Sequence, residues 1–456
     1  MPIRKFSGVI RAQQSRAKLE TPRGTYTLIP YPQQAALSIK MMEAMGEKLF
    51  GYLDGQAADI EGNLADDVIY NARTAESGMS IQDVRLAPES KDRFSVEIEQ
   101  HFRKGSSEIT EKLNLAGIRT VSALYHRIKN NYEPEVAAFS KYLKVREERI
   151  KEFISALEAN ADNRALVAAS PRFPVRRGVN LAVMAQLKGV PVKMKAPSAP
   201  PQFPAVGVTP ELPSKVDMTV HVTPVKNQGM RGTCVAHTVA ACLEAELIKK
   251  GKATSKKLDL SEQYLYWGCK HVDGSPNTEG TFIEYAVEVL LNGVAKKKLA
   301  GGVCKDKEWP YNRLPVTGNE SHNPPPAAAL KSFKGNKQDR VLNYTRLKHN
   351  SIKAVKAALA AGHCVGLSVY TYHFWTDDFA WREGVISLPI NIQPDDAHAV
   401  CLVGYRDNDA THSDGYFIFK NSWDIQWGYG RPDPGYGSLP YRYLLKEAIE
   451  AFTVEV

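Results

Sequence analysis

The chain has 456 residues, of which 43% are hydrophobic and 24% are charged, and its formal net charge at pH 7 is +9. This length allows roughly two to four domains, and the composition is ordinary for a soluble globular protein. No apolar run approaches the roughly 20 residues of a membrane span, and the N-terminal residues lack the apolar core of a secretory signal. The mild positive charge permits contact with nucleic acid without requiring it.

Residues 1–75 predict a small β-rich module. Short segments that alternate polar and apolar residues favour strands at Ser7–Ile10, Gly24–Ile29 and Lys48–Leu53, and a helix is expected over Gln33–Met45. The order of these segments resembles a small OB-like barrel. Such barrels often bind nucleic acids or sugars, and a packing or partner-docking module is the alternative.

Residues 100–160 predict a helical module. Ile109, Leu113 and Ile118 surround Gly117 in a stretch that resembles a helix-hairpin-helix unit, and residues 139–157 are a candidate for its second half. Such units can seat a DNA phosphate on the backbone N–H groups of the turn, or they serve as plain protein-interaction modules. A protein or a nucleic acid therefore stays open as a partner of the N-terminal modules, whereas no membrane partner is expected.

Residues 168–212 form a linker-like stretch between these modules and the second half of the chain. Prolines recur through it, and they favour an extended chain that cannot continue a helix. The sequence therefore predicts a Pro-rich linker here.

The stretch from 223 to 243 organises the second half of the chain. Gln228 and Gly229 precede a short loop, and Cys234 then opens a run of strong helix formers. A cysteine in the first turn of a helix lies beside unpaired N–H groups and the positive end of the helix dipole. This position lowers the pKa of a thiol and favours the nucleophilic thiolate, and the Gln228 amide can reach an oxyanion beside the sulfur. A buried structural cysteine is the alternative.

Two later segments complete a candidate catalytic set. His398 lies near the start of an apolar, strand-like run from 395 to 405, and Asn421 follows a short apolar strand that begins at 417. Either residue alone is commonly structural. Together, in the order cysteine, histidine and asparagine, they supply the nucleophile, the base and the orienting amide of a cysteine acyl-transfer site.

Three blocks, QGMRGTCVAH, DAHAVCLVGY and FKNSWDIQWGYG, closely resemble the active-site blocks of papain-like cysteine peptidases and follow that family's chain order. Shorter matches lie at 258–264, 308–311 and 362–370, so the resemblance covers residues 212–456. It implies an α+β fold for residues 213–456, with two lobes and a cleft between them. The helical lobe would be led by the Cys234 helix, and a β-barrel-like lobe would carry His398 and Asn421.

The resemblance also implies a role for each candidate. His398 would deprotonate Cys234, which would attack a peptide carbonyl. Gln228 and the Cys234 backbone N–H would hold the oxyanion. Asn421 would orient His398, and Trp423 would shield that hydrogen bond from water. No cofactor is implied, and the absence of a CxxC or HxxxH pattern argues against a metal site.

Candidates for substrate binding follow from the same resemblance. They are Gly280, Thr281, Phe282, Ile283, Ala397 and Trp423. Gly280 and Thr281 stand where the family has a double glycine, so we expect weaker backbone pairing with substrate. Phe282 and Ile283 are candidates for an apolar pocket beside the cleft, and packing inside a helix over 282–291 is the alternative.

Departures from the family pattern bear on location and activation. Arg231 stands where secreted relatives carry a bridging cysteine, and Cys269 has no clear partner, so we expect a reducing, cytoplasmic interior. His237 is either a rival base or, as we favour, a core histidine. The linker is either a spacer or a pro-segment that lies along the cleft and is cut on activation. The N-terminal half lacks the long-helix signature of papain-family propeptides, which favours the spacer.

Three classes of function remain open from the sequence. The first is a cysteine endopeptidase that hydrolyses peptide bonds through a thioester acyl-enzyme, with N-terminal modules that recruit a substrate or partner. The second is a papain-fold acyltransferase or deamidase that uses the same residues with a different acceptor. The third is a catalytically silent binding scaffold, against which the intact set of Gln228, Cys234, His398 and Asn421 argues.

Overall fold

The computed structural model describes residues 4–13, 16–21, 24–30, 57–65, 68–74, 91–102, 105–160, 163, 167, 212–254, 258–316, 321, 324–335, 341, 343–408 and 414–456. The helix expected at 33–45, the strand expected at 48–53 and the linker residues 168–211 lie outside this part. No helix within it combines the length and the apolar character that a membrane crossing requires.

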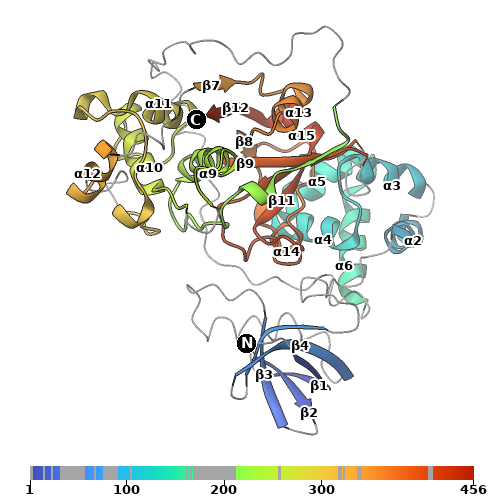
Figure 1. The fold of residues 1–456 in the computed structure, drawn as a ribbon. Helices are drawn as coiled ribbons and strands as arrows, with labels where there is room; N and C mark the ends of the chain where they lie inside the picture. Colours follow the sequence, from blue (N-terminus) through green and yellow to red (C-terminus); the bar gives the residue numbers. More distant parts are fainter. Residues whose placement is uncertain are drawn as a thin grey trace.

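Five strands near the N-terminus close into a barrel in the order β1-β2-β3-β5-β4 (Figure 1). They are β1 (Arg4–Gln13), β2 (Arg16–Thr21), β3 (Gly24–Pro30), β4 (Ala57–Ala65) and β5 (Val68–Thr74). β3 and β5 pair in parallel, and the other neighbours are antiparallel. Two of the predicted strands are confirmed, because they lie inside β1 and β3. The OB-like function of this module stays a prediction.

A bundle of helices follows the barrel in the sequence, and we call α2–α6 the helical module. Its helices are α2 (Lys91–Phe102), α3 (Ser106–Leu115), α4 (Val121–Asn130), α5 (Tyr132–Leu143) and α6 (Glu147–Ala159). The turn between α3 and α4 passes through Gly117 with φ of 75°, which glycine adopts without strain. Thr120 begins α4, since its Oγ accepts the Ala123 N–H at 3.1 Å. Ile109, Leu113 and Ile118 are buried in the module's apolar core.

The helical lobe of the second half is built around α9. Its helices are α9 (Cys234–Lys249), α10 (Glu262–Val272), α11 (Ile283–Asn292) and α12 (Ala327–Gly335), with short 3-10 turns η3 (Thr219–His221), η4 (Ala295–Lys297) and η5 (Asp306–Glu308). α10 and α11 pack against one side of α9, and β8, β9 and β12 contact it from the sheet. α9 is therefore buried along most of its length, as a helix that is apolar nearly all round must be.

The β-rich lobe is an antiparallel sheet whose described strands run in the order β11-β10-β9-β8-β12-β7, with β6 paired to β9. The strands are β6 (Lys215–Asp217), β7 (Asn343–Arg346), β8 (Val365–Thr371), β9 (Asp396–Arg406), β10 (Tyr416–Lys420), β11 (Tyr436–Pro440) and β12 (Ala448–Glu455). Around it lie α13 (Ile352–Ala360), η6 (His373–Thr376), α14 (Asp378–Glu383) and α15 (Tyr441–Glu447). These strands form an open sheet. The sequence predicts a barrel-like lobe here.

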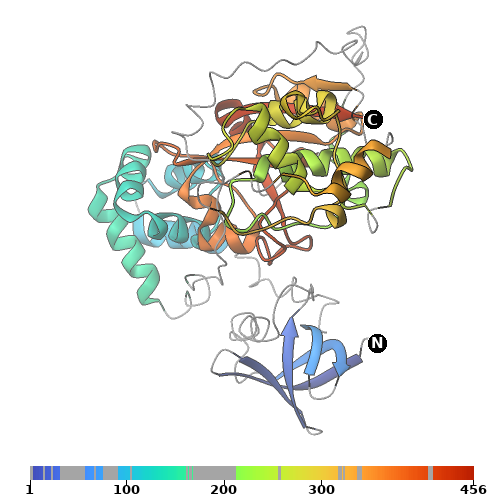
Figure 2. The ribbon, with the colours of Figure 1, turned by 90° about the vertical axis from the view of Figure 1, so that its left-hand side faces the viewer.

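The predicted α+β class is confirmed, and the arrangement explains where a site can form. The sheet lies between the helical lobe on one side and the helical module on the other (Figures 1 and 2). α9 starts beside β9, and β9 pairs with β10 in register from Tyr416–Arg406 to Lys420–Cys401. The first residue of α9, the start of β9 and the end of β10 are thus brought to one region from widely separated parts of the chain.

Candidate active site

Cys234 is the first residue of α9. Thr233 occupies the N-cap position but makes no capping hydrogen bond. Its hydroxyl instead lies 2.5 Å from the Tyr311 hydroxyl, which itself donates to the Gln228 carbonyl at 2.9 Å. The first N–H groups of a helix have no intrahelical acceptor, so this helix start can offer donors and a positive dipole end to an anion.

His398 and Asn421 are joined by a short hydrogen bond. His398 Nε2 lies 2.8 Å from Asn421 Oδ1, and the Ser422 N–H also donates to that oxygen at 2.8 Å. Because an amide oxygen can only accept, the neutral imidazole carries its proton on Nε2. Nδ1 is then the basic nitrogen, and it is buried without a hydrogen-bond partner among the residues that the structure describes. The asparagine thus sets the tautomer that a general base needs.

Two tryptophans pack against the imidazole, and a third packs against one of them. Trp423 stacks on His398 with ring centroids 4.5 Å apart and an interplanar angle of 25°, and Trp375 meets it edge-on at 6.0 Å. Trp427 packs edge-on against Trp423 at 5.8 Å. All three are fully buried. They exclude water from the bond between His398 and Asn421, which strengthens that bond in a low local dielectric.

Burial governs the proton affinities of the candidate pair. It raises the pKa of Cys234 to about 12, while the backbone N–H groups of Ala399, Val235 and Cys234 itself act in the opposite direction. It lowers the pKa of His398 to about 4, against the effect of the Asn421 hydrogen bond. The lowered thiol pKa expected from the helix start is therefore wrong, because desolvation outweighs the donors. Because the Ala399 N–H lowers the pKa of the thiol through a hydrogen bond, Cys234 lies close to the residue that follows His398.

Gln228 is fixed to the same loop as Asn421. Its backbone N–H donates to the Ser422 carbonyl at 2.8 Å, and the Ser422 hydroxyl donates to its Oε1 at 2.6 Å. Its Nε2 donates to the Arg231 carbonyl at 2.9 Å. The side chain is fully buried, so its amide is held in one orientation. Sequence reasoning missed Ser422 as the residue that orients this amide, although it directly follows Asn421.

The predicted substrate-binding residues are packed into the interior. The Gly280 N–H donates to the Tyr266 hydroxyl at 2.9 Å, and Lys270 donates to the Gly280 carbonyl at 2.6 Å. The Thr281 hydroxyl donates to Asp273 at 3.0 Å. These bonds commit the Gly280 peptide groups to the helical lobe, so pairing with a substrate strand would have to use other groups.

The remaining candidates are buried as well. Phe282 is 8% and Ile283 0% exposed, and both belong to the main apolar core, which favours core packing over an open pocket. Ala397 is 4% exposed and its N–H donates to Asp396 at 3.0 Å. A role in substrate binding stays a prediction for these residues. Trp423 is fully buried and stacks directly on His398, which fits the shielding role, and its contact with substrate stays a prediction.

His237 lies in the core, as the sequence interpretation favoured. Its Nδ1 is 3.1 Å from the Thr233 carbonyl, and its ring meets Tyr311 edge-on at 4.7 Å. Burial lowers its pKa to about 3. A carbonyl partner requires the proton on Nδ1, so this nitrogen is committed to the turn that precedes α9 and not to the Cys234 thiol.

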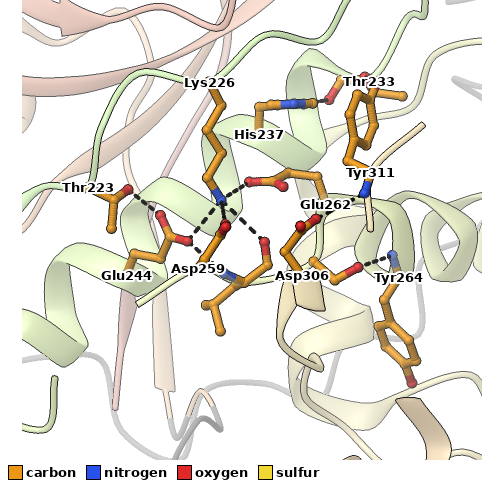
Figure 3. A network of polar contacts seen from close by, with 12 residues as sticks. Thr223, Lys226, Thr233, His237, Glu244, Asp259, Glu262, Tyr264, Asp306 and Tyr311 are labelled. Atoms are coloured by element: carbon orange, nitrogen blue, oxygen red, sulfur yellow. Dashed lines mark hydrogen bonds and ion pairs between the residues drawn. The ribbon is translucent and has the colours of Figure 1, made fainter. Parts of the chain in front are cut away.

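A buried ion cluster supports the site from behind (Figure 3). Lys226 Nζ lies 3.1 Å from Glu244, 2.7 Å from Asp259 and 2.5 Å from Glu262. Burial alone would lower the pKa of Lys226, but the three carboxylates outweigh it and raise that pKa. Glu244 projects from α9, so the cluster anchors the nucleophile helix.

The same cluster reaches the strand that leads to Asn421. Lys420 donates to the Thr223 hydroxyl at 3.0 Å, and Thr223 donates to Glu244 at 2.5 Å. A cavity of about 10 Å³, room for about one water molecule, lies between this cluster and Asn421. Sequence reasoning missed the cluster, although its signal was present as charged residues inside apolar stretches.

Among the described residues, no group of three or more His, Cys, Asp or Glu side chains could hold a metal ion.

Known proteins resemble the second half of the chain. A family model described as "Papain family cysteine protease" matches residues 212–438. Procathepsin L of Felis catus is 29% identical over 227 residues, which cover 48% of this chain and 59% of that protein. A cathepsin L-like peptidase of Aedes aegypti is 29% identical over 229 residues, which cover 50% of this chain and 58% of the relative.

Among solved structures, xylellain, a cysteine protease from Xylella fastidiosa, matches with 27% identity and a TM-score of 0.44, covering 54% of this chain and 87% of that one. The chain spans less than two thirds of the length of the two curated relatives above. The family model covers the predicted Cys234, His398 and Asn421 positions in one continuous match. Residues 212–438 of this chain therefore form a domain that belongs to the papain family of cysteine proteases.

Proposed function

We propose that the chain is a cysteine endopeptidase that hydrolyses peptide bonds through Cys234, His398 and Asn421. The observation that carries the proposal is the state of the His398 imidazole. Its Nε2 is held by Asn421 at 2.8 Å, and its Nδ1 is buried and has no hydrogen-bond partner in the part of the chain that the structure describes. A basic nitrogen that is oriented, desolvated and unpaired is what a general base requires.

Burial raises the pKa of Cys234 and lowers the pKa of His398, so it disfavours either charge alone. A proton transfer from Sγ to Nδ1 forms both charges together, as a thiolate–imidazolium pair. Such a pair needs no net charge inside the protein. The thiolate attacks the carbonyl carbon, and Nδ1–H then protonates the leaving amine as the C–N bond breaks.

Deacylation repeats these steps with water. Nδ1 takes a proton from the water that attacks the thioester, the C–S bond breaks, and the proton returns to the sulfur. The oxyanion in both steps is stabilised by the Cys234 N–H and the Gln228 amide, whose orientation Ser422 fixes. Removal of one such donor typically costs about 10² to 10³ in rate.

We also propose a reducing, cytoplasmic location and a recruiting role for the N-terminal barrel. The first proposal draws on Arg231, which occupies the position of a bridging cysteine. Its guanidinium donates to Gln263 at 2.7 Å and to the Asn312 carbonyl at 2.8 Å, and it packs over Tyr266 and Tyr311. These contacts of Arg231 hold the Gln228 loop on the helical lobe without a disulfide.

The recruiting role draws on the barrel of β1–β5, because barrels of this size often bind a partner on one face.

The experiment measures cleavage of unfolded casein by the purified full-length protein in H₂¹⁸O. Wild type is expected to generate new C-termini that carry ¹⁸O, and Cys234→Ala to generate none. Cys269→Ala removes a different buried thiol and is the matched control, with activity close to wild type. A folded wild type that cleaves nothing would refute the proposal. Products that carry an added amine in place of ¹⁸O would favour the acyltransferase instead.

A further inference from the structure

The helical module packs directly on the second half of the chain. α4 contacts η6 and α14, and the Leu388 N–H donates to the Ala116 carbonyl at 2.9 Å. Ile390 is 4% exposed and lies within the apolar core of the module, with Phe379 packed against it. Figure 2 shows the module flanking this part of the papain-family domain. The module's core is thus completed by residues of the peptidase domain.

Arg127 on α4 is the centre of this contact. It is 1% exposed, and its Nη1 donates to the Ser387 hydroxyl at 2.9 Å and to the Leu388 carbonyl at 2.6 Å. Its Nε forms an ion pair with Glu135 at 3.2 Å, and its guanidinium lies 4.3 Å from the centre of the Phe374 ring. Because the planar guanidinium both donates hydrogen bonds and stacks on a ring, it fixes the position and the orientation of its partners.

Residues of α4 and α5 also hold the η6 turn in place. Glu135, on α5, is fully buried and lies 3.1 Å from His373 Nε2. Asn130 donates its amide N–H to the His373 carbonyl at 3.0 Å. η6 therefore begins with two residues, His373 and Phe374, that are held by the helical module.

The next residue of η6 is Trp375, which reaches the proposed catalytic pair. Its ring meets His398 edge-on at 6.0 Å, and its Nε1 donates to the Tyr443 hydroxyl at 2.8 Å. Its carbonyl accepts from Trp427 Nε1 at 3.2 Å, and Trp427 packs against Trp423. A shift of η6 would therefore move the wall against which the imidazole is packed.

We propose that Arg127 is a positioning residue for the peptidase reaction, which makes the helical module a working part of the active site. Arg127 acts through η6 and Trp375 on His398. This inference rests on the proposed function of the Cys234–His398 pair. It differs from the recruiting and DNA-binding roles that the sequence left open for this module. The hairpin turn supports the difference, since the N–H groups of Ala116, Gly117 and Ile118 donate within the turn itself.

The test compares variants of the full-length protein by two constants, kcat per titrated active site and KM. A thiol-directed epoxysuccinyl probe counts the competent Cys234 in each preparation. Arg127→Met keeps the length of the side chain but removes its charge and donors, and we expect kcat per titrated site to fall about 10²-fold, with KM within about twofold. Arg127→Lys is expected to recover part of kcat. The control is Lys129→Met on the same helix, since Lys129 pairs with Glu158 at the surface, and it should leave both constants unchanged.

A purely structural role predicts a different result. In that case Arg127→Met would reduce the number of titratable sites and leave kcat per site unchanged, which would overturn the inference. If Arg127→Met does not fold, Asn130→Ala decides, because it deletes one exposed hydrogen bond to η6. We expect it to lower kcat per site severalfold, and an unchanged kcat would also overturn the inference. A folded wild type with no titratable Cys234 would instead refute the proposed function.

Discussion

Replacement of Lys226 by methionine tests whether the buried ion cluster stabilises the domain. Glu244 and Glu262 are 0% and 2% exposed, so loss of the Lys226 ammonium leaves two desolvated carboxylates that still interact with Lys420. Breaking a buried pair by removing one partner typically costs about 3–5 kcal/mol. We expect Lys226→Met to lower the free energy of unfolding by about that amount at pH 8.

The loss should depend on pH in a defined direction. Burial raises the pKa of Glu262 to about 7, while Lys226 acts to lower it. A carboxyl whose folded pKa exceeds its unfolded value makes the protein less stable as pH rises, and one pH unit corresponds to about 1.4 kcal/mol. Without Lys226 this decline continues past pH 7, whereas in wild type it levels off. The loss at pH 8 should therefore exceed the loss at pH 5 by about 1.4 kcal/mol or more.

Urea unfolding of the full-length protein at pH 5 and pH 8 measures both quantities. Lys151→Met is the control, because Lys151 pairs with Glu133 in an exposed position, and solvent screening leaves such pairs with little effect on stability. The double variant Lys226→Met/Glu262→Gln should recover part of the loss at pH 8. A loss below about 1 kcal/mol, or an equal loss at both pH values, would refute the reasoning.

Two further changes test the site and its surroundings. Asn421→Ala removes the acceptor that sets the His398 tautomer, so kcat should fall by about 10² or more with little change in KM in steady-state peptide cleavage. An unchanged kcat would contradict the orienting role. Asp377→Asn keeps the N-cap acceptor of α14 but removes a carboxyl whose pKa burial raises to about 7. That raised pKa makes the folded protein less stable as pH rises from about 4 to about 7. In urea unfolding the variant should therefore lack this decline and be more stable than wild type at pH 8. An unchanged pH dependence would contradict the raised pKa of Asp377.

The order and spacing of the candidate catalytic residues were readable from the sequence because each lies at the end of a local element. Cys234 opens a helix, His398 lies near the start of an apolar strand and Asn421 follows one, and local patterns predict such positions well. The α+β class follows from the same patterns. The pKa of Cys234 was predicted with the wrong sign, because the degree of burial is a tertiary property that a helix start does not reveal.

The residues that support the site were not predictable in the same way. Trp375 reaches His398 only because β8 pairs with β9 and the following turn folds back over the imidazole. Arg127 lies more than 250 residues from the carbonyl that it binds, and nothing in its own helix distinguishes it from a surface arginine. Contacts of this kind depend on how separate elements pack, and a sequence pattern of one element carries no information on them.

The most direct test of the central claim is the site of covalent labelling by an epoxysuccinyl probe in the full-length protein. All six cysteines of the chain are free and buried, so a probe that reacts only by accessibility would label several of them poorly. The account predicts modification at Cys234 alone, at one probe per folded chain, and no modification of Cys234 in His398→Ala under the same conditions. Labelling spread over the other cysteines, or labelling of Cys234 that does not depend on His398, would contradict it.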